Sequence, residues 1–93
     1  MQNLRQSTIH DARYVCIIKL LIQARKTAGI SQLDLANKLG FSQPDISKIE
    51  RLERRLDITE CLDMLHIISN GDRSMFTQLW DEINECHQVS ATS

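Results

Sequence analysis

Four polar side chains form a candidate recognition surface within a short stretch of the sequence: Gln43, Asp45, Ser47 and Lys48. Ile46 lies among them and Ile49 follows at helical spacing, so the stretch predicts a short helix with one apolar and one polar face. A Gln amide can bond bidentately to adenine, and Ser or Lys can bond bases or phosphates. The chemistry that this face offers is therefore hydrogen bonding to base edges in a DNA groove. A helical hairpin with a solvated polar face accounts for the same pattern.

The residue types needed for catalysis or metal binding are too scattered to form a recognisable site. The sequence has no glycine-rich phosphate loop, no His-Glu-x-x-His and no nucleophile beside an evident base. Its histidines are isolated from one another: His10, His66 and His87. The odd number of cysteines shows no paired spacing, which predicts small buried side chains in a reducing compartment: Cys16, Cys61 and Cys86. We therefore expect no enzymatic activity, no metal and no cofactor.

Capping and breaking residues place the polar face on the second of two short helices. Ser31 can cap the first, whose apolar stripe follows at helical spacing: Leu33, Leu35, Ala36 and Leu39. Gly40 stands where that helix must stop, in a position that favours positive φ. Ser42 can cap the second helix, and Pro44 falls in its first turn, where a missing N–H costs little. Residues 31–50 thus predict two helices joined by a tight turn.

Helical patterns flank this pair on both sides. The sequence predicts a helix over residues 9–28, with Thr8 as its cap and apolar residues around more than one face. This helix should pack on the two short helices and on either the C-terminal helix or a partner subunit. Asp57, with Glu60 in capping-box position, should start a further helix that ends at an Asn-Gly pair. Asp72 should cap the last helix, whose apolar face fits a core or a dimer contact: Met75, Phe76, Leu79, Trp80 and Ile83.

The central stretch resembles the helix-turn-helix of phage repressors and Cro proteins, the XRE family. The resemblance covers about residues 12–70 and rests on matches at fixed spacing: Arg25, Gly29-Ile30-Ser31-Gln32, Leu35-Ala36, Leu39-Gly40, Ser42-Gln43, Ile46-Ser47-Lys48-Ile49-Glu50 and Glu53-Arg54-Arg55-Leu56-Asp57. It implies an all-α, five-helix lambda-repressor-like DNA-binding domain with the helix-turn-helix as helices two and three. We expect this single domain over residues 9–86, between a flexible N-terminus (1–8) and a flexible tail (87–93).

The resemblance also implies a function, that of a sequence-specific double-stranded DNA-binding transcriptional regulator acting as a homodimeric repressor on a palindromic operator. Its base-reading residues would be Gln43, Pro44, Ser47 and Lys48. A second group would contact the DNA backbone: Ser31, Gln32, Lys38, Ser42, Arg54 and Arg55. Arg25 and Glu50 would form a structural ion pair, because a guanidinium can hold a partly buried carboxylate bidentately and fix the angle between two helices.

Two positions depart from the family pattern. Leu52 stands where relatives usually carry a helix-stopping glycine, and leucine disfavours the left-handed conformation that glycine permits. The third helix would then run on, or Leu52 would pack at a subunit contact. Pro44 stands where the family often has a polar residue, so direct readout at that position should be poorer.

Charge is segregated along the chain, although the net charge is only −1. Residues 1–26 carry five basic side chains against one acidic, whereas residues 57–93 carry one arginine against seven acidic side chains. A DNA-binding protein needs only a local positive surface, so the net charge does not oppose that function. The composition, 42% hydrophobic and 25% charged over 93 residues, is typical of a soluble globular domain. No signal peptide or membrane span is visible, which favours a cytoplasmic location.

Two other functions fit the same sequence. The antitoxin of a toxin–antitoxin pair would use the same module on its own promoter, and the acidic C-terminal third would then hold a basic protein partner. A protein-interaction module that has kept the fold but lost DNA binding fits the negative net charge and Pro44.

Overall fold

The computed structural model describes residues 10–88, which form five α-helices and a final 3-10 turn and contain no strand. These elements are α2 (Ala12–Thr27), α3 (Gln32–Leu39), α4 (Gln43–Glu50), α5 (Ile58–Ser69), α6 (Arg73–Glu85) and η2 (Cys86–Gln88). The prediction of an all-α, five-helix domain is confirmed. The segment 1–8 and residues 89–93 of the expected tail lie outside the described residues, whereas residues 87 and 88 belong to η2.

The predicted caps set the start of four helices. In each case a side-chain oxygen accepts a hydrogen bond of 2.8–3.2 Å from the backbone N–H three residues later, at Ser31, Ser42, Asp57 and Asp72. Gly40, at φ 76°, and Asn70, at φ 50°, end α3 and α5 in the left-handed conformation. The local signals therefore give correct boundaries for α3 and α5 and the correct starts of α4 and α6.

The first helix begins later than predicted. α2 starts at Ala12, because Asp11 caps it by accepting a hydrogen bond of 2.8 Å from the backbone N–H of Arg13. The predicted start at residue 9 is therefore wrong, and the proposed cap Thr8 lies outside the described residues.

The end of α4 also differs from expectation. The helix stops at Glu50, and Leu52 itself adopts the left-handed conformation, with φ 63°. Two backbone hydrogen bonds hold this turn, from the N–H of Leu52 to Ile49 at 3.1 Å and from Glu53 to Lys48 at 2.7 Å. The Leu52 side chain packs against the core of its own chain. The expectation that α4 runs on is therefore wrong, and packing and hydrogen bonds offset the roughly 1–2 kcal/mol that this conformation costs a leucine.

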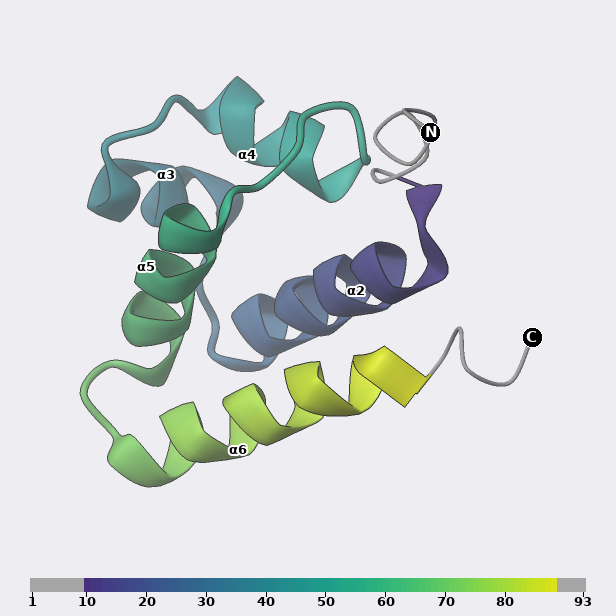
Figure 1. Cartoon of the computed structure of the whole chain (residues 1–93). Coiled ribbons are helices and arrows are strands. Elements are labelled where there is room, and N and C mark those ends of the chain that lie inside the picture. The colour runs from purple at the N-terminus through teal and green to yellow at the C-terminus, as the bar shows by residue number, and fades with distance from the viewer. Residues whose placement is uncertain (1–9, 89–93) are drawn as a thin grey trace.

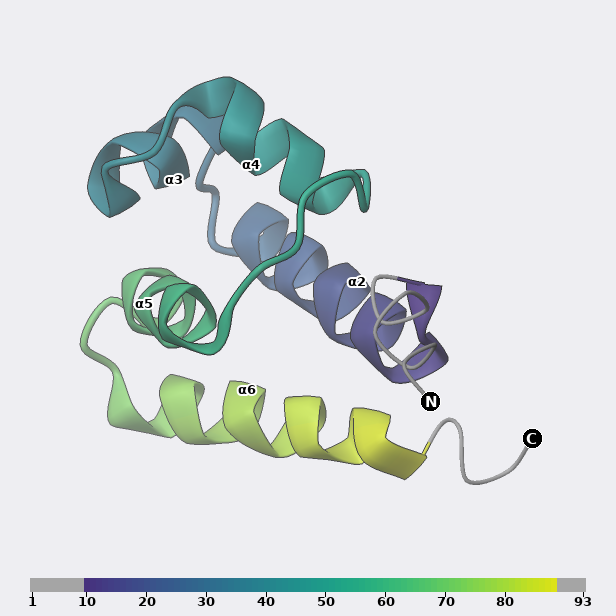
Figure 2. The same cartoon turned by 45° about the horizontal axis from the view of Figure 1, so that its top comes forward.

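Helix α2 lies at the centre of the fold, with α3 and α4 on one side and α6 on the opposite side (Figures 1 and 2). It contacts α4, α5, α6 and η2, so the prediction that it packs on two sides is confirmed, with α6 as the C-terminal partner. The most deeply buried residues of the main core cluster come from four helices: Ile18, Leu35, Ala36, Ile46, Ile49, Leu65 and Ile68. Of the apolar residues predicted on one face of α6, Trp80 remains 40% exposed and the others join or pack against the core.

Within residues 10–88, no helix combines the length and the apolar character needed to cross a membrane.

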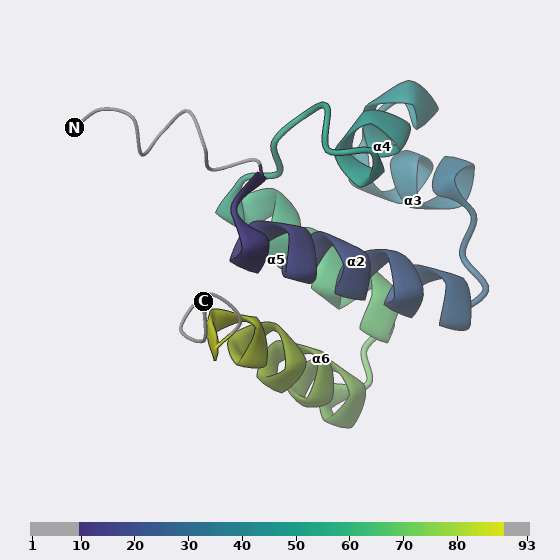
Figure 3. The ribbon, with the colours of Figure 1, turned by 90° about the vertical axis from the view of Figure 1, so that its right-hand side faces the viewer.

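A disulfide between Cys16 and Cys86 links the first turns of α2 to η2. The two Cα atoms are 5.7 Å apart, because α6 runs back along α2 and brings its end beside the start of that helix (Figure 3). The prediction of three reduced cysteines is therefore wrong for this pair. Its members are 70 residues apart, so no local spacing signals the bond. Cys61 is free and half-buried, and burial raises the pKa of its thiol.

Candidate nucleic-acid interface

The candidate recognition helix is α4, which presents its N-terminal turn to solvent. Ile46 and Ile49 are 0% and 2% exposed and attach the helix to the core, whereas Pro44 and Lys48 are exposed. A capping box closes the first turn, with reciprocal hydrogen bonds of 3.2 Å between Ser42 and Asp45. The bonds from the Ser42 backbone N–H and hydroxyl lower the pKa of the Asp45 carboxyl. The helix start is therefore capped by hydrogen bonds and accessible.

Behind this helix, Arg25 and Glu50 form a bidentate ion pair. Arg25 Nε donates to Glu50 Oε2 at 2.7 Å, and Arg25 Nη2 donates to Glu50 Oε1 at 3.1 Å. The side chains are only 8% and 13% exposed. Arg25 Nη1 also donates to the backbone carbonyl of Ile30 at 2.7 Å, which ties the turn before α3 to the same group. The guanidinium thus fixes α2, the start of α3 and the end of α4 relative to one another.

The two glutamines predicted to contact DNA are bonded to each other and to this ion pair. Gln43 Nε2 donates to Gln32 Oε1 at 2.7 Å, and Gln32 Nε2 donates to Glu50 Oε1 at 2.8 Å. Both glutamines are half-buried rather than fully outward. Among the described residues, no buried side-chain oxygen or nitrogen lacks a hydrogen-bond partner. The amide of Gln43 is therefore held in place at the start of α4.

The other predicted base-reading residues differ in whether their polar atoms already form hydrogen bonds or ion pairs within the protein. The Ser47 hydroxyl accepts a hydrogen bond of 2.7 Å from Arg51, which also pairs with Glu53 at 3.1 Å. Lys48 is exposed and has no ion-pair partner in residues 10–88. Pro44 offers only an apolar surface.

Among the predicted backbone-contacting residues, Ser31 and Ser42 use their hydroxyl oxygens as helix caps. The Ser31 hydroxyl keeps its hydrogen for a further acceptor, whereas the Ser42 hydroxyl also interacts with the Asp45 carboxyl. Lys38, at the end of α3, is exposed, and in the described part of the chain it forms no ion pair. The structure thus leaves two exposed lysines, Lys38 and Lys48, on the helix pair.

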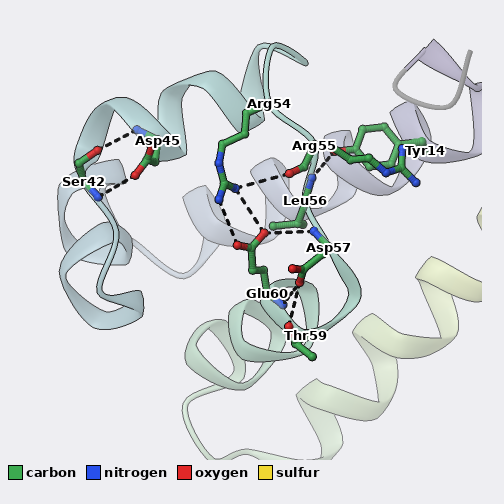
Figure 4. A network of polar contacts seen from close by, with 9 residues as sticks. All are labelled: Tyr14, Ser42, Asp45, Arg54, Arg55, Leu56, Asp57, Thr59 and Glu60. Atoms are coloured by element: carbon green, nitrogen blue, oxygen red, sulfur yellow. Dashed lines mark hydrogen bonds and ion pairs between the residues drawn. The ribbon is translucent and has the colours of Figure 1, made fainter. Parts of the chain in front are cut away.

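Arg54 and Arg55 occupy the connection between α4 and α5 (Figure 4). Arg54 donates to Glu60 at 3.1 and 3.3 Å, and its guanidinium lies 5.0 Å from the centre of the Phe41 ring. The hydrogen bonds to Glu60 raise the pKa of Arg54. Arg55 lies 4.8 Å above the Tyr14 ring. Both arginines therefore hold the connection in place. Arg54 is only partly available to a phosphate, whereas Arg55 is exposed and forms no ion pair within residues 10–88.

Sequence reasoning did not find the partners of these arginines. The Tyr14 hydroxyl accepts a hydrogen bond of 2.9 Å from the backbone N–H of Leu56, across 42 positions of sequence (Figure 4). Glu60 was predicted only as a capping residue, and it does bond the backbone N–H of Asp57 at 3.1 Å. Its second role toward Arg54 depends on how the α4–α5 connection folds back, which no local pattern indicates.

Comparison with known families supports the assignment that this geometry suggests. A family model described as helix-turn-helix matches residues 21–68, which include Arg25, Gln32, Gln43 and Glu50. No curated protein matches the chain. The family is a DNA-binding, non-enzymatic class of domain. Because the match spans just over half of the 93 residues and contains the whole α3–α4 pair, the chain belongs to the XRE-type helix-turn-helix family of DNA-binding regulators.

Proposed function

We propose that the protein is a sequence-specific transcriptional regulator that inserts α4 into the major groove of duplex DNA. The observation that carries this proposal is the amide of Gln43, held by Gln32 at the accessible start of α4. A Gln amide that is already ordered loses little rotamer freedom when it bonds a base edge. Adenine fits it best, because adenine presents a donor and an acceptor side by side in the major groove.

The neighbouring side chains would complete the interface. Pro44 would contact a thymine methyl group or the groove wall, and Ser47 and Lys48 would contact bases or phosphates. A wider group would bind the phosphate backbone, helped by the N-terminal dipole of α3: Ser31, Gln32, Lys38, Ser42, Arg54 and Arg55. The exposure of Lys38 and Lys48 supports this arrangement, whereas the ion pair with Glu60 makes Arg54 a weaker contributor.

The regulator would act as a homodimeric repressor on a palindromic operator. A recognition helix of eight residues reads few base pairs, so two copies are needed for a specific site. The 40% exposed Trp80 on α6, on the far side of α2 from α4, is compatible with a contact between copies. The two recognition helices would lie about 34–36 Å apart, one turn of DNA. Sedimentation that shows only monomer at high concentration, with and without a palindromic duplex, would contradict this part.

Selection of bound duplexes from a random pool tests the proposal directly. The protein should enrich one sequence, and its affinity should fall steeply between about 50 and 200 mM salt, as phosphate contacts release counterions. Gln43→Ala should cost about 1–3 kcal/mol of binding free energy and relax the preference at one base position. An equal loss on every sequence would contradict the base-reading role of Gln43.

A second candidate function is that of an antitoxin which also binds its own promoter. Exposed acidic residues on α5 and α6 and in the turn between them favour it: Asp63, Asp72, Asp81 and Glu85. They would attract a basic protein partner. Salt-sensitive complex formation with the product of an adjacent small reading frame would support this function. If that product does not bind while operator DNA does, the antitoxin function is excluded.

A further inference from the structure

Glu50 is the fixed end of a hydrogen-bond chain that leads to the proposed base reader. A carboxylate can only accept hydrogen bonds, and Glu50 accepts them from Arg25 at both of its oxygens. Gln32 can therefore approach Glu50 only with its amide nitrogen, as it does at 2.8 Å. The side chain of Gln32 is thus oriented by the chemistry of Glu50 rather than by shape.

This orientation passes on to Gln43. With its nitrogen toward Glu50, Gln32 presents its oxygen to Gln43, whose nitrogen donates to it at 2.7 Å. Gln43 must then keep Oε1 and its second N–H for an outside partner. The Oε1 atom has no hydrogen-bond partner within residues 10–88 and is not buried, since no buried side-chain oxygen there is unpaired.

Helix geometry allows one glutamine to bridge both ends of α4. Gln43 and Glu50 are the first and last residues of the helix, about two turns apart, so they lie on the same face. Gln32 is the first residue of α3 and bonds both of them. The chain Glu50–Gln32–Gln43 therefore joins the core ion pair to the exposed tip of the recognition helix.

We infer that Glu50, acting through Gln32, sets the order of acceptor and donor that Gln43 presents to DNA and so is a positioning residue for adenine specificity. The inference rests on the proposed function. Adenine offers an N–H donor at N6 and an acceptor at N7, which match the oxygen and the N–H of a Gln amide in one order only. A reversed amide would place N–H against N–H and oxygen against N7. Specificity at this base thus depends on a side chain that touches no DNA.

Glu50→Gln tests this inference, because it keeps the shape but replaces one acceptor by a donor. The side-chain amides of Gln32 and Gln43 would then have no single preferred orientation. The measurement is the ratio of affinities for two duplexes, one with adenine and one with thymine at the position that Gln43→Ala identifies. We expect this ratio to fall about tenfold or more. A folded variant that binds all duplexes more weakly, with the ratio unchanged, would overturn the inference.

Two further variants separate positioning from stability. Glu60→Gln removes the same charge from the ion pair with Arg54, which has no link to Gln43, so the ratio should stay at its wild-type value. Gln32→Leu removes the hydrogen-bond link between Glu50 and Gln43 but leaves the Arg25–Glu50 bonds in place. It should lower the affinity ratio as Glu50→Gln does. If Glu50→Gln does not fold, Gln32→Leu decides the question. A folded Gln32→Leu with the wild-type ratio would overturn the inference.

A readout without DNA keeps this inference distinct from the proposed function. The side-chain amide resonances of Gln43 in a nitrogen–proton NMR spectrum should shift in Glu50→Gln and stay in place in Glu60→Gln. Unshifted Gln43 resonances in both variants would overturn the inference alone. If the wild-type protein binds no duplex with sequence preference, the proposed function fails, whatever the spectra show.

Discussion

Replacing Arg25 by alanine should cost more stability than any other single change at the interface. The variant removes two hydrogen bonds to Glu50 and one of 2.7 Å to the Ile30 carbonyl. It leaves a carboxylate that is only 13% exposed, with Gln32 as its one remaining hydrogen-bond donor among residues 10–88. Breaking a buried pair from one side costs about 3–5 kcal/mol, and the residual exposure favours the lower end, about 3 kcal/mol. For a domain of this size, that lowers Tm by roughly 12–24 °C.

Urea unfolding followed by circular dichroism measures this loss as a change in midpoint at constant slope. Arg51→Ala is the matched control, because it also removes an arginine bonded to a glutamate, but there both side chains are more than half exposed. Its midpoint should stay close to wild type. A loss below about 1 kcal/mol for Arg25→Ala would show that the pair does not hold the helices together.

The remaining stability predictions concern the disulfide and the left-handed leucine. Reduction of the bond between Cys16 and Cys86, which closes a loop of 70 residues, should lower the free energy of unfolding by about 4 kcal/mol. Urea titrations with and without dithiothreitol measure this, with Cys61→Ser as a control that responds equally; identical midpoints would refute it. At Leu52, the glycine variant should be more stable than the alanine variant by about 1 kcal/mol, because only glycine has no Cβ at φ 63°. The opposite order in thermal unfolding would show that φ is not the limiting factor.

Local sequence signals predicted most helix boundaries because each signal acts within a few residues. Ser31 and Ser42 bond N–H groups three positions away, and Gly40 needs only its own φ. The same reasoning misplaced the start of α2, because Asp11 offers a competing cap closer to the hydrophobic run. Boundaries follow from sequence where a single capping residue is available and become ambiguous where two are.

Local sequence patterns could not predict the interactions between distant segments. No spacing in the sequence indicates that Cys16 bonds to Cys86, or that the Tyr14 hydroxyl bonds to the backbone of Leu56. From the sequence, Leu52 is an unfavourable turn residue, because the packing of its side chain on the core cannot be predicted from local patterns. The resemblance to a family supplied one long-range contact, Arg25 with Glu50, but not the bond from Gln32 that links this pair to Gln43.

The bond from Gln32 to Glu50 gives the buried ion pair a second role, that of orienting Gln43. Replacing both members of the pair by apolar residues can separate this role from stability. Exchanging both members of a buried ion pair for apolar residues of similar size is often neutral for stability, so Arg25→Met combined with Glu50→Leu should recover most of the roughly 3 kcal/mol lost in Arg25→Ala. Leu at position 50 offers Gln32 no acceptor, however, so nothing then fixes the amide of Gln43. The double variant should therefore unfold near the wild-type midpoint and still lose its preference for adenine in duplex binding. A stable double variant that keeps this preference would mean that the DNA alone orients Gln43.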